Sequence, residues 1–362
     1  MSFSEIRDQS MPVRLLRNTL RLGRIPNGLL FWGPGGVGKM LTARQLAKAV
    51  NCVAGAPDAC GECLACRKAE NGTHPDVKAI RPMSKSRLIR VIDIEPIIEL
   101  ASYRPFEGKR RIVIIEDVER MNIAAQNHFL KTLEEPPSDT TFVLVTEHPR
   151  RLLPTLRSRC QQVRFGALSP ETVSELLLRR HDLPAEVAAA IAALSQGQMD
   201  RAEDLVESEK REVVLSITQR LAEGDDPLVV SEEFAGHLGA RRDEVTAAAK
   251  EHMSEMRGER DMDKEEREEL KTAAEAAAAA TIRRDLMEYL YLLQTWYRDG
   301  LVYGATRAPE RVLNRDQIAR LEKESDAARP EKLDAIEQSW IYIERNLNID
   351  RVFRDLFMTL AA

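Results

Sequence analysis

The run GPGGVGKM, residues 33–40, has the spacing of a phosphate-binding loop except at its last position. Such a loop has a glycine, four further residues, Gly-Lys, and then serine or threonine. Its backbone N–H groups surround phosphate at the start of a helix, and its lysine reaches the terminal phosphates. Because the run joins the apolar segment LLFW to the helical pattern LTARQLAKAV, we expect a nucleotide-type loop rather than a turn that only resembles one. The expected loop residues are Gly33, Gly35, Gly36, Gly38, Lys39 and Met40.

Met40 stands where a serine or threonine hydroxyl normally ligates Mg²⁺, and a thioether is a poor ligand for that hard cation. Thr42 lies two residues later on the helix and is expected to point elsewhere. The second apolar run, RIVIIEDV, ends in Glu116-Asp117, the reverse of a metal-binding Asp followed by a catalytic Glu. Glu116 could approach magnesium, whereas Asp117 is one methylene short for positioning water. Both acids could instead be solvated strand ends, but beside Met40 they predict a degenerate site, with doubtful Mg-ATP binding and no hydrolysis.

Four of the five cysteines lie close together in the pattern C-x₇-C-x₂-C-x₂-C. Four thiolates suit tetrahedral zinc, and a site closed by four sulfurs leaves no open position for catalysis. The sequence therefore predicts a structural zinc site, with free buried thiols or a redox pair as the alternatives. His74 is expected to be an ordinary polar residue. The predicted ligands are Cys52, Cys60, Cys63 and Cys66.

Composition narrows the class of protein. A chain of 362 residues can form two or three domains, and its net charge of −5 does not favour bulk binding to nucleic acid. The N-terminus lacks the apolar run of a secretory signal, and no stretch approaches the roughly 18 apolar residues of a membrane span. We therefore expect a cytoplasmic protein.

Apolar runs alternate with helical patterns up to Phe165, which predicts an α/β fold with a parallel sheet covered on both faces. The expected strands are LLFW, RIVIIEDV, TFVLVT and QQVRF. After Phe165 no convincing strand follows. Residues 239–282 are rich in Ala, Glu, Lys and Arg, and indicate a long solvated helix pair or a partly flexible insertion.

The run from Ile114 to Cys160, which contains LEEPP and ends in LRSRC, resembles the clamp-loader subunits of bacterial DNA polymerase III, a family of the AAA+ class. It is most similar to the delta-prime type, whose gamma/tau relatives share the order of glycine loop, four-cysteine module, acid strand, LEEPP and SRC. The run ERNLNIDRVFRDLF resembles the C-terminal collar helix of that type. The resemblance is strong over residues 1–205, weaker over 283–362, and absent over 239–282.

This resemblance implies three domains: an AAA+ P-loop domain at 1–166 with the zinc module at about 52–66, a helical lid at 167–208, and a helical collar at 209–362. It also implies a stator that binds gamma/tau and delta, and that reaches the sliding clamp and primer–template DNA through the complex. Such a subunit typically has no ATPase activity of its own, although it is part of the DNA polymerase III holoenzyme. By motif match, Arg159 of SRC projects into a neighbouring ATP site as an arginine finger. Arg201 of GQMDR takes the second-sensor position, or is only structural where its own site is inactive.

Two other functions remain open from the residues. An active gamma/tau-type ATPase is disfavoured by Met40 and the reversed acids. A zinc-dependent nucleic-acid-binding module is disfavoured by the acidic net charge and by the lack of interleaved basic and aromatic residues around the cysteines.

Overall fold

The computed structural model describes residues 2–55, 57–80, 89–137, 139–259, 264–324 and 330–362. The chain divides into two compact units. The first contains Met1–Thr172 and Gly197–Asp200, and the second contains Val173–Gln196 and Arg201–Ala362. The change of character expected near Phe165 lies close to the first boundary, while the expected division into a separate lid and collar stays a prediction.

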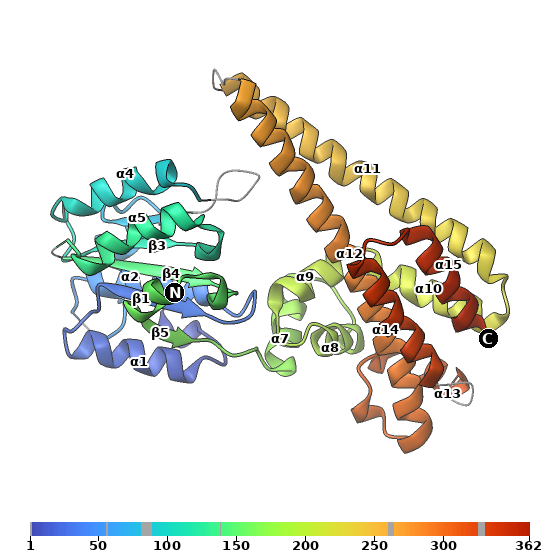
Figure 1. Cartoon of the computed structure of the whole chain (residues 1–362). Coiled ribbons are helices and arrows are strands. Elements are labelled where there is room, and N and C mark those ends of the chain that lie inside the picture. The colour runs from blue at the N-terminus through green and yellow to red at the C-terminus, as the bar shows by residue number, and fades with distance from the viewer. Residues whose placement is uncertain (1, 56, 81–88, 138, 260–263, 325–329) are drawn as a thin grey trace. The chain divides into compact units, whose positions relative to one another are not determined.

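The first unit is built on five parallel strands in the order β2-β3-β4-β1-β5 (Figure 1). The strands are β1 (Gly28–Trp32), β2 (Val77–Ile80), β3 (Arg111–Ile115), β4 (Thr140–Thr146) and β5 (Gln161–Arg164). This arrangement confirms the predicted parallel α/β fold. Strand β2 was not predicted, because VKAI is a short edge segment whose two central residues are exposed, and it lacks the apolar signal of the buried strands.

Helices of the first unit connect these strands and cover them. They are α1 (Ser10–Arg21), α2 (Lys39–Asn51), α3 (Leu64–Glu70), α4 (Val91–Ser102), α5 (Ile123–Glu134) and α6 (Pro154–Ser158), with short 3-10 turns η1 (Phe3–Glu5), η2 (Val118–Arg120) and η3 (Pro149–Arg151). Helix α2 contacts β3 and β4, whereas α5 packs with α4 and α6. The helices place the glycine loop after β1, the acids after β3 and the SRC motif at the end of α6.

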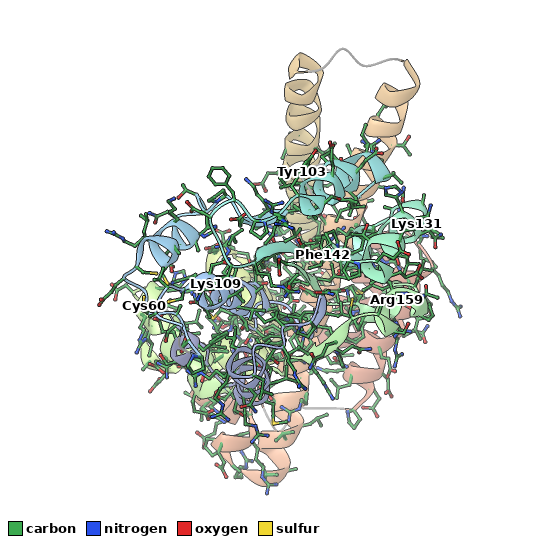
Figure 2. The ribbon with its side chains drawn as sticks, turned by 90° about the vertical axis from the view of Figure 1, so that its left-hand side faces the viewer. Cys60, Tyr103, Lys109, Lys131, Phe142 and Arg159 are labelled. Atoms are coloured by element: carbon green, nitrogen blue, oxygen red, sulfur yellow. The ribbon has the colours of Figure 1, made fainter. Side chains whose placement is uncertain are left out.

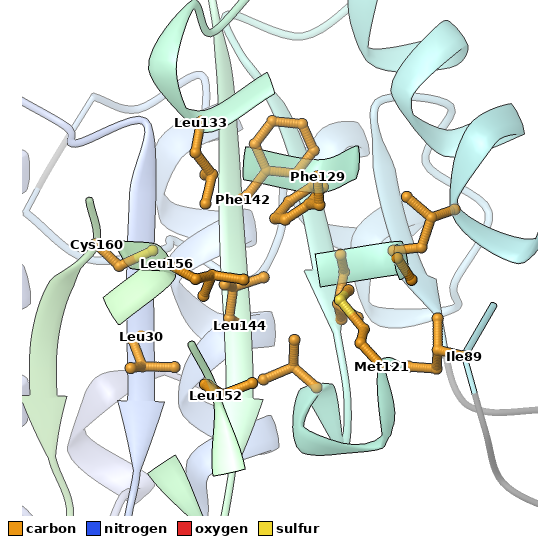
Figure 3. Close-up of a cluster of buried hydrophobic side chains, with 14 of the residues drawn as sticks. Leu30, Ile89, Met121, Phe129, Leu133, Phe142, Leu144, Leu152, Leu156 and Cys160 are labelled. Carbon is orange, nitrogen blue, oxygen red and sulfur yellow. The ribbon is translucent and has the colours of Figure 1, made fainter. Parts of the chain in front are cut away.

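A large apolar core lies between the sheet and helices α4, α5 and α6 (Figure 3). Alternate residues of the strands, such as Leu30 and Leu144, point into it, because successive side chains of a strand face opposite sides of a sheet. Phe129 of α5 meets Phe142 of β4 edge to face, with ring centroids 5.0 Å apart. Truncating a buried aromatic of this kind typically costs about 3–5 kcal/mol of stability.

The described residues of the second unit form helices and connecting turns and contain no strand, as expected for the chain after Phe165. Its helices are α7 (Pro170–Arg180, whose first turn belongs to the first unit), α8 (Ala185–Leu194), α9 (Met199–Glu207, whose first two residues belong to the first unit), α10 (Lys210–Glu223), α11 (Pro227–Glu259), α12 (Lys264–Thr306), α13 (Ile318–Glu324), α14 (Pro330–Glu344) and α15 (Ile349–Ala361), with 3-10 turns η4 (Pro309–Arg311) and η5 (Arg315–Gln317). None of the helices within the described ranges is long and apolar enough to cross a membrane.

Residues 239–282 lie mainly in α11 and α12, two long helices that run side by side (Figure 1). Of the two structures expected for this stretch, its described residues form the helix pair. An aromatic cluster joins the pair to α15: the Phe234 ring lies 5.1 Å from Tyr289, 4.8 Å from Phe353 and 5.5 Å from Phe357. The pair is therefore anchored by tertiary packing as well as by its own helical propensity.

A buried ion pair ties the edge of the sheet to α4. The Asp76 carboxylate, 0% exposed, accepts hydrogen bonds from the backbone N–H groups of Phe106, Glu107 and Gly108 at 2.7–2.9 Å. Arg111 of β3 donates to it at 3.0 Å and also bonds carbonyl oxygens at the end of α4 and just beyond it. Burial alone raises the pKa of Asp76, but these donors outweigh burial and lower the pKa below its ordinary value.

Asp76→Asn is expected to destabilise the first unit by about 3–5 kcal/mol, because it leaves the Arg111 charge buried without its partner. The contribution of Asp76 is complete above its unfolded pKa of about 3.9 and is lost as pH falls through the lower folded pKa. Hydrogen exchange of the β3 amides in the full chain measures both effects. Asp93→Asn, at an exposed pair with Arg90, is the control and should cost at most about 1 kcal/mol. Equal costs for the two variants would contradict this account.

Candidate functional site

The glycine loop joins β1 to α2, as the sequence predicts, and two of its glycines are required by close packing. A methyl group on Gly33 (φ +151°) would lie 2.4 Å from the carbonyl oxygen of Phe165. A methyl group on Gly36 (φ +64°) would lie 2.3 Å from the backbone nitrogen of Asp200. Only glycine adopts these positions without strain or collision. The loop is therefore packed against the segment after β5 and against residues 199–200.

Lys39 is folded back into the loop. Its side chain is buried, with 7% exposed, and its Nζ donates to the carbonyl oxygens of Gly33, at 2.8 Å, and Pro34. Burial lowers the pKa of Lys39, and the nearby carboxylates of Glu147 and Asp200 partly offset that effect. The Lys39 ammonium thus donates hydrogen bonds to the loop carbonyls and lies close enough to Glu147 and Asp200 to interact with their charges.

Two acids that sequence reasoning did not single out lie against the loop. A methyl group on Gly35 would meet Glu147 Oε1 at 2.8 Å and Asp200 Oδ2 at 3.5 Å. Glu147 follows β4, and Asp200 is the second residue of α9. Carboxylates in this place oppose the binding of an anionic phosphate. For Asp200, the sequence signal lay in the motif GQMDR, in which Asp200 packs on the loop and directly precedes Arg201.

Arg201 makes its polar contacts elsewhere. Its guanidinium donates to Glu288 Oε1 at 2.9 and 3.0 Å and lies 3.9 Å from the centre of the Tyr291 ring. These contacts, all within the second unit, fit the structural alternative that the sequence left open for Arg201. Its assignment to the nucleotide site stays a prediction.

Met40 lies at the start of α2, and the two acids Glu116 and Asp117 lie directly after β3. Met40 is half-buried in the first turn of α2, while the Thr42 hydroxyl donates to the Gly38 carbonyl at 2.8 Å and so points away from position 40. Glu116 is half-buried directly after β3, where its N–H donates to the Ile80 carbonyl at 2.9 Å. Asp117 has a left-handed backbone (φ +50°) and forms an ion pair with Arg120 at 3.4 Å. The Asp117 carboxylate is thus directed to its own 3-10 turn.

The four predicted cysteine ligands come together between α2 and α3, and their sulfur atoms all lie within 4.8 Å of one another. Cys52 ends α2, and Cys63 caps the start of α3. The Sγ atoms of Cys60 and Cys66 are 3.9 Å apart, close to the spacing of about 3.8 Å that Zn–S bonds of 2.3 Å require in a tetrahedron. The cluster can therefore hold a metal ion, and an all-thiolate donor set suits zinc.

Backbone N–H groups donate to the sulfurs of Cys52, Cys60 and Cys63. Hydrogen bonds from the backbone of Val53 and Cys66 lower the pKa of Cys63 to about 6, whereas burial raises the pKa of Cys66 to about 12. The fifth cysteine, Cys160, is buried in the core, where burial raises its pKa to about 12. It takes no part in the cluster.

Arg159 of the SRC motif lies at the surface, at the end of α6. Its side chain is 36% exposed and forms an ion pair with Glu134, and its Nη1 donates to the Thr155 carbonyl at 3.0 Å. Figure 2 shows Arg159 and Cys60 toward opposite edges of the face in view. The cysteine cluster is thus separate from the exposed arginine, so a metal there would act on folding rather than on the arginine.

The part of the chain that contains these motifs is similar to known proteins. The sequence model of the family described as "DNA polymerase III, delta subunit" matches residues 8–169. The chain is similar to the delta' subunit of DNA polymerase III from Bacillus subtilis, with 32% identity over 59% of this chain and 66% of the relative. It is also similar to the delta' subunit from Pseudomonas aeruginosa, with 38% identity over 46% of this chain and 52% of the relative.

The tau subunit of DNA polymerase III from Escherichia coli is 32% identical over 72% of this chain and 39% of its own length. The matched region thus spans about half to two thirds of the delta' relatives and a smaller part of tau. The matched region of 8–169 contains the glycine loop, the cysteine cluster, the acids after β3 and the SRC motif. Residues 8–169 thus match the DNA polymerase III delta-subunit family, and delta' subunits and tau are among the proteins to which the chain is similar.

Proposed function

We propose that this chain is a delta'-like stator of the DNA polymerase III clamp loader. In this role it binds gamma/tau and delta, acts in the cytoplasm, and helps place the sliding clamp on primed DNA. The observation that carries the proposal is the contrast between the exposed Arg159 and the chain's own glycine loop. Arg159, in the family's SRC motif, is exposed, while the chain's own glycine loop has a methionine at the magnesium position and carboxylates against it.

The arginine is proposed to act in a neighbouring subunit. A guanidinium carries charge at all ordinary pH values and can make forked contacts to phosphate oxygens. Supplied from a second subunit, it stabilises the charge that develops during phosphoryl transfer. The chain therefore takes part in ATP hydrolysis by the complex without hydrolysing ATP itself.

An active gamma/tau-type ATPase is the second candidate, since tau of Escherichia coli matches 72% of this chain. The loop geometry favours the stator. A thioether cannot replace the hydroxyl ligand of Mg²⁺, and Asp117 is directed to Arg120. Measurement of ATP turnover distinguishes the two candidates.

The metal at the cysteine cluster is proposed to be structural zinc. Four thiolates at Cys52, Cys60, Cys63 and Cys66 leave no open coordination position. The metal would fix the α2–α3 connection, because the ligands come from the end of α2, the following loop and the start of α3.

Zinc should be present at about one atom per chain. Removing it with a chelator should destabilise the first unit, because binding free energy at such a site is also folding free energy. Metal analysis and thermal unfolding of chain purified without chelator test this. Cys63→Ser should lower zinc content, while the control Cys160→Ala should retain it. Zinc affinity should fall as pH falls, since the thiols must lose protons to bind. Wild-type protein without zinc would contradict the assignment.

The purified chain should show no measurable ATP turnover. Met40→Thr restores a hydroxyl and should improve nucleotide affinity, but hydrolysis should stay absent or poor because Asp117 cannot position water. Calorimetry with Mg-ATP and a phosphate-release assay measure the two effects. The double variant Met40→Thr/Lys39→Ala is the control and should lose the gained affinity. Rapid turnover by wild-type chain free of contaminating ATPase would favour the gamma/tau alternative.

Arg159→Ala should leave folding, zinc content and complex assembly intact, but lower the clamp- and DNA-stimulated ATPase of the reconstituted loader. Clamp loading should fall further, because an arginine finger is worth about 10³–10⁵ in rate at its own site, while other motors maintain part of the total turnover. Arg159→Lys should rescue poorly, since an ammonium lacks the planar fork. Arg151→Ala, at an exposed arginine of η3, is the matched control. Wild-type rates for Arg159→Ala in a complete complex would contradict the proposal that Arg159 acts as an arginine finger.

A further inference from the structure

The guanidinium of Arg159 is held between the ends of two helices. Its Nη1 donates to the Thr155 carbonyl of α6 at 3.0 Å, and its Nη2 pairs with Glu134 Oε1 at the last residue of α5. Residue 159 itself is the C-cap of α6. Two contacts from different elements therefore restrain a side chain that is otherwise at the surface.

These contacts leave the guanidinium able to bind a further anion. A guanidinium has five N–H donors in a fixed plane. The contacts with Thr155 and Glu134 engage one N–H donor on Nη1 and one on Nη2. The Arg159 side chain is 36% exposed and that of Glu134 is 47% exposed, so solvent or a partner can reach both. A restrained finger loses less conformational freedom when it meets phosphate than a mobile one.

The adjacent acid, Glu135, provides a comparison. It is exposed and caps the end of α5, and no contact between it and Arg159 occurs among the residues that the structure describes. Lys131 of α5, on the same side of the view in Figure 2 as Arg159, is exposed and carries the same sign of charge as the finger. Glu134 is therefore the acid of this helix end that orients the guanidinium.

We propose that Glu134 is a positioning residue for Arg159, which sets the direction of the finger before it enters the neighbouring ATP site. This inference rests on the proposed function of Arg159. Because the pair is exposed, its strength is modest, and removing it should slow the reaction of the adjoining motor by at most about fivefold, equivalent to about 1 kcal/mol. The loss should appear in kcat, since the finger acts on charge that develops in the transition state.

The experiment compares loaders reconstituted with wild type, Glu134→Ala, Glu134→Gln, Glu135→Ala, Arg159→Ala and Arg159→Ala/Glu134→Ala. ATP-dependent clamp loading is measured as a function of ATP concentration, after complex assembly and zinc content are verified for each. Glu134→Ala should lower the maximal rate about two- to fivefold with KM for ATP unchanged. Glu134→Gln should lose less, since its amide oxygen still accepts a hydrogen bond. Glu135→Ala should match wild type, and the double variant should match Arg159→Ala.

Three results would overturn the positioning role while Arg159→Ala remains slow: Glu134→Ala at the wild-type rate, Glu134→Ala faster than wild type, or a further loss from Glu134→Ala in the Arg159→Ala background. A wild-type rate for Arg159→Ala itself would instead contradict the arginine-finger role of Arg159, and with it the positioning role of Glu134. The two failures are thus distinguishable.

Discussion

The close approach of backbone to backbone at Gly33 and Gly36 determines what the first unit can do. At Gly33 the loop contacts the carbonyl of Phe165, and at Gly36 it contacts the backbone of Asp200. These contacts bring the start of α9 onto the loop and place the Asp200 carboxylate beside it, with Glu147 next to Gly35. The loop therefore has the shape of a phosphate site and carries charges that oppose a phosphate. Met40 also lacks a hydroxyl for magnesium, and both features support the proposal that this loop does not hydrolyse ATP.

Other groups of the first unit differ from this loop in what they can do. A metal in the cysteine cluster would, as we propose, fix the connection between α2 and α3, while the Asp76–Arg111 pair ties the edge of the sheet to α4. Both are arrangements that hold backbone in place. Arg159 differs from Arg111 in being exposed and held by an exposed partner, so its charge can be offered to another molecule at small cost. This exposed arginine supports the proposed stator role, in which the chain supplies a cation to a neighbouring site.

The buried strands could be predicted because β3 and β4 are continuous apolar runs, and the loop could be predicted because its glycines have fixed spacing. The cysteine cluster could be predicted as well, because four cysteines within fifteen positions are close enough in sequence to share one site. Strand β2 could not be predicted, because its pairing with β3 supplies the stability that VKAI lacks on its own. Glu147, Asp200 and Glu134 were also missed. Each gains its role from contact with a residue distant in the sequence. Local sequence patterns do not specify such contacts, although GQMDR already contained Asp200.

The most direct test of the account is a structure of the complete clamp loader with a non-hydrolysable ATP analogue, Mg²⁺, clamp and primed DNA. The account predicts the Arg159 guanidinium within hydrogen-bond distance of the terminal phosphate bound by the neighbouring subunit. It also predicts that the loop at Gly33–Met40 carries no magnesium-bound triphosphate. Mg-ATP ordered in this loop, with Arg159 remote from every nucleotide, would contradict the account.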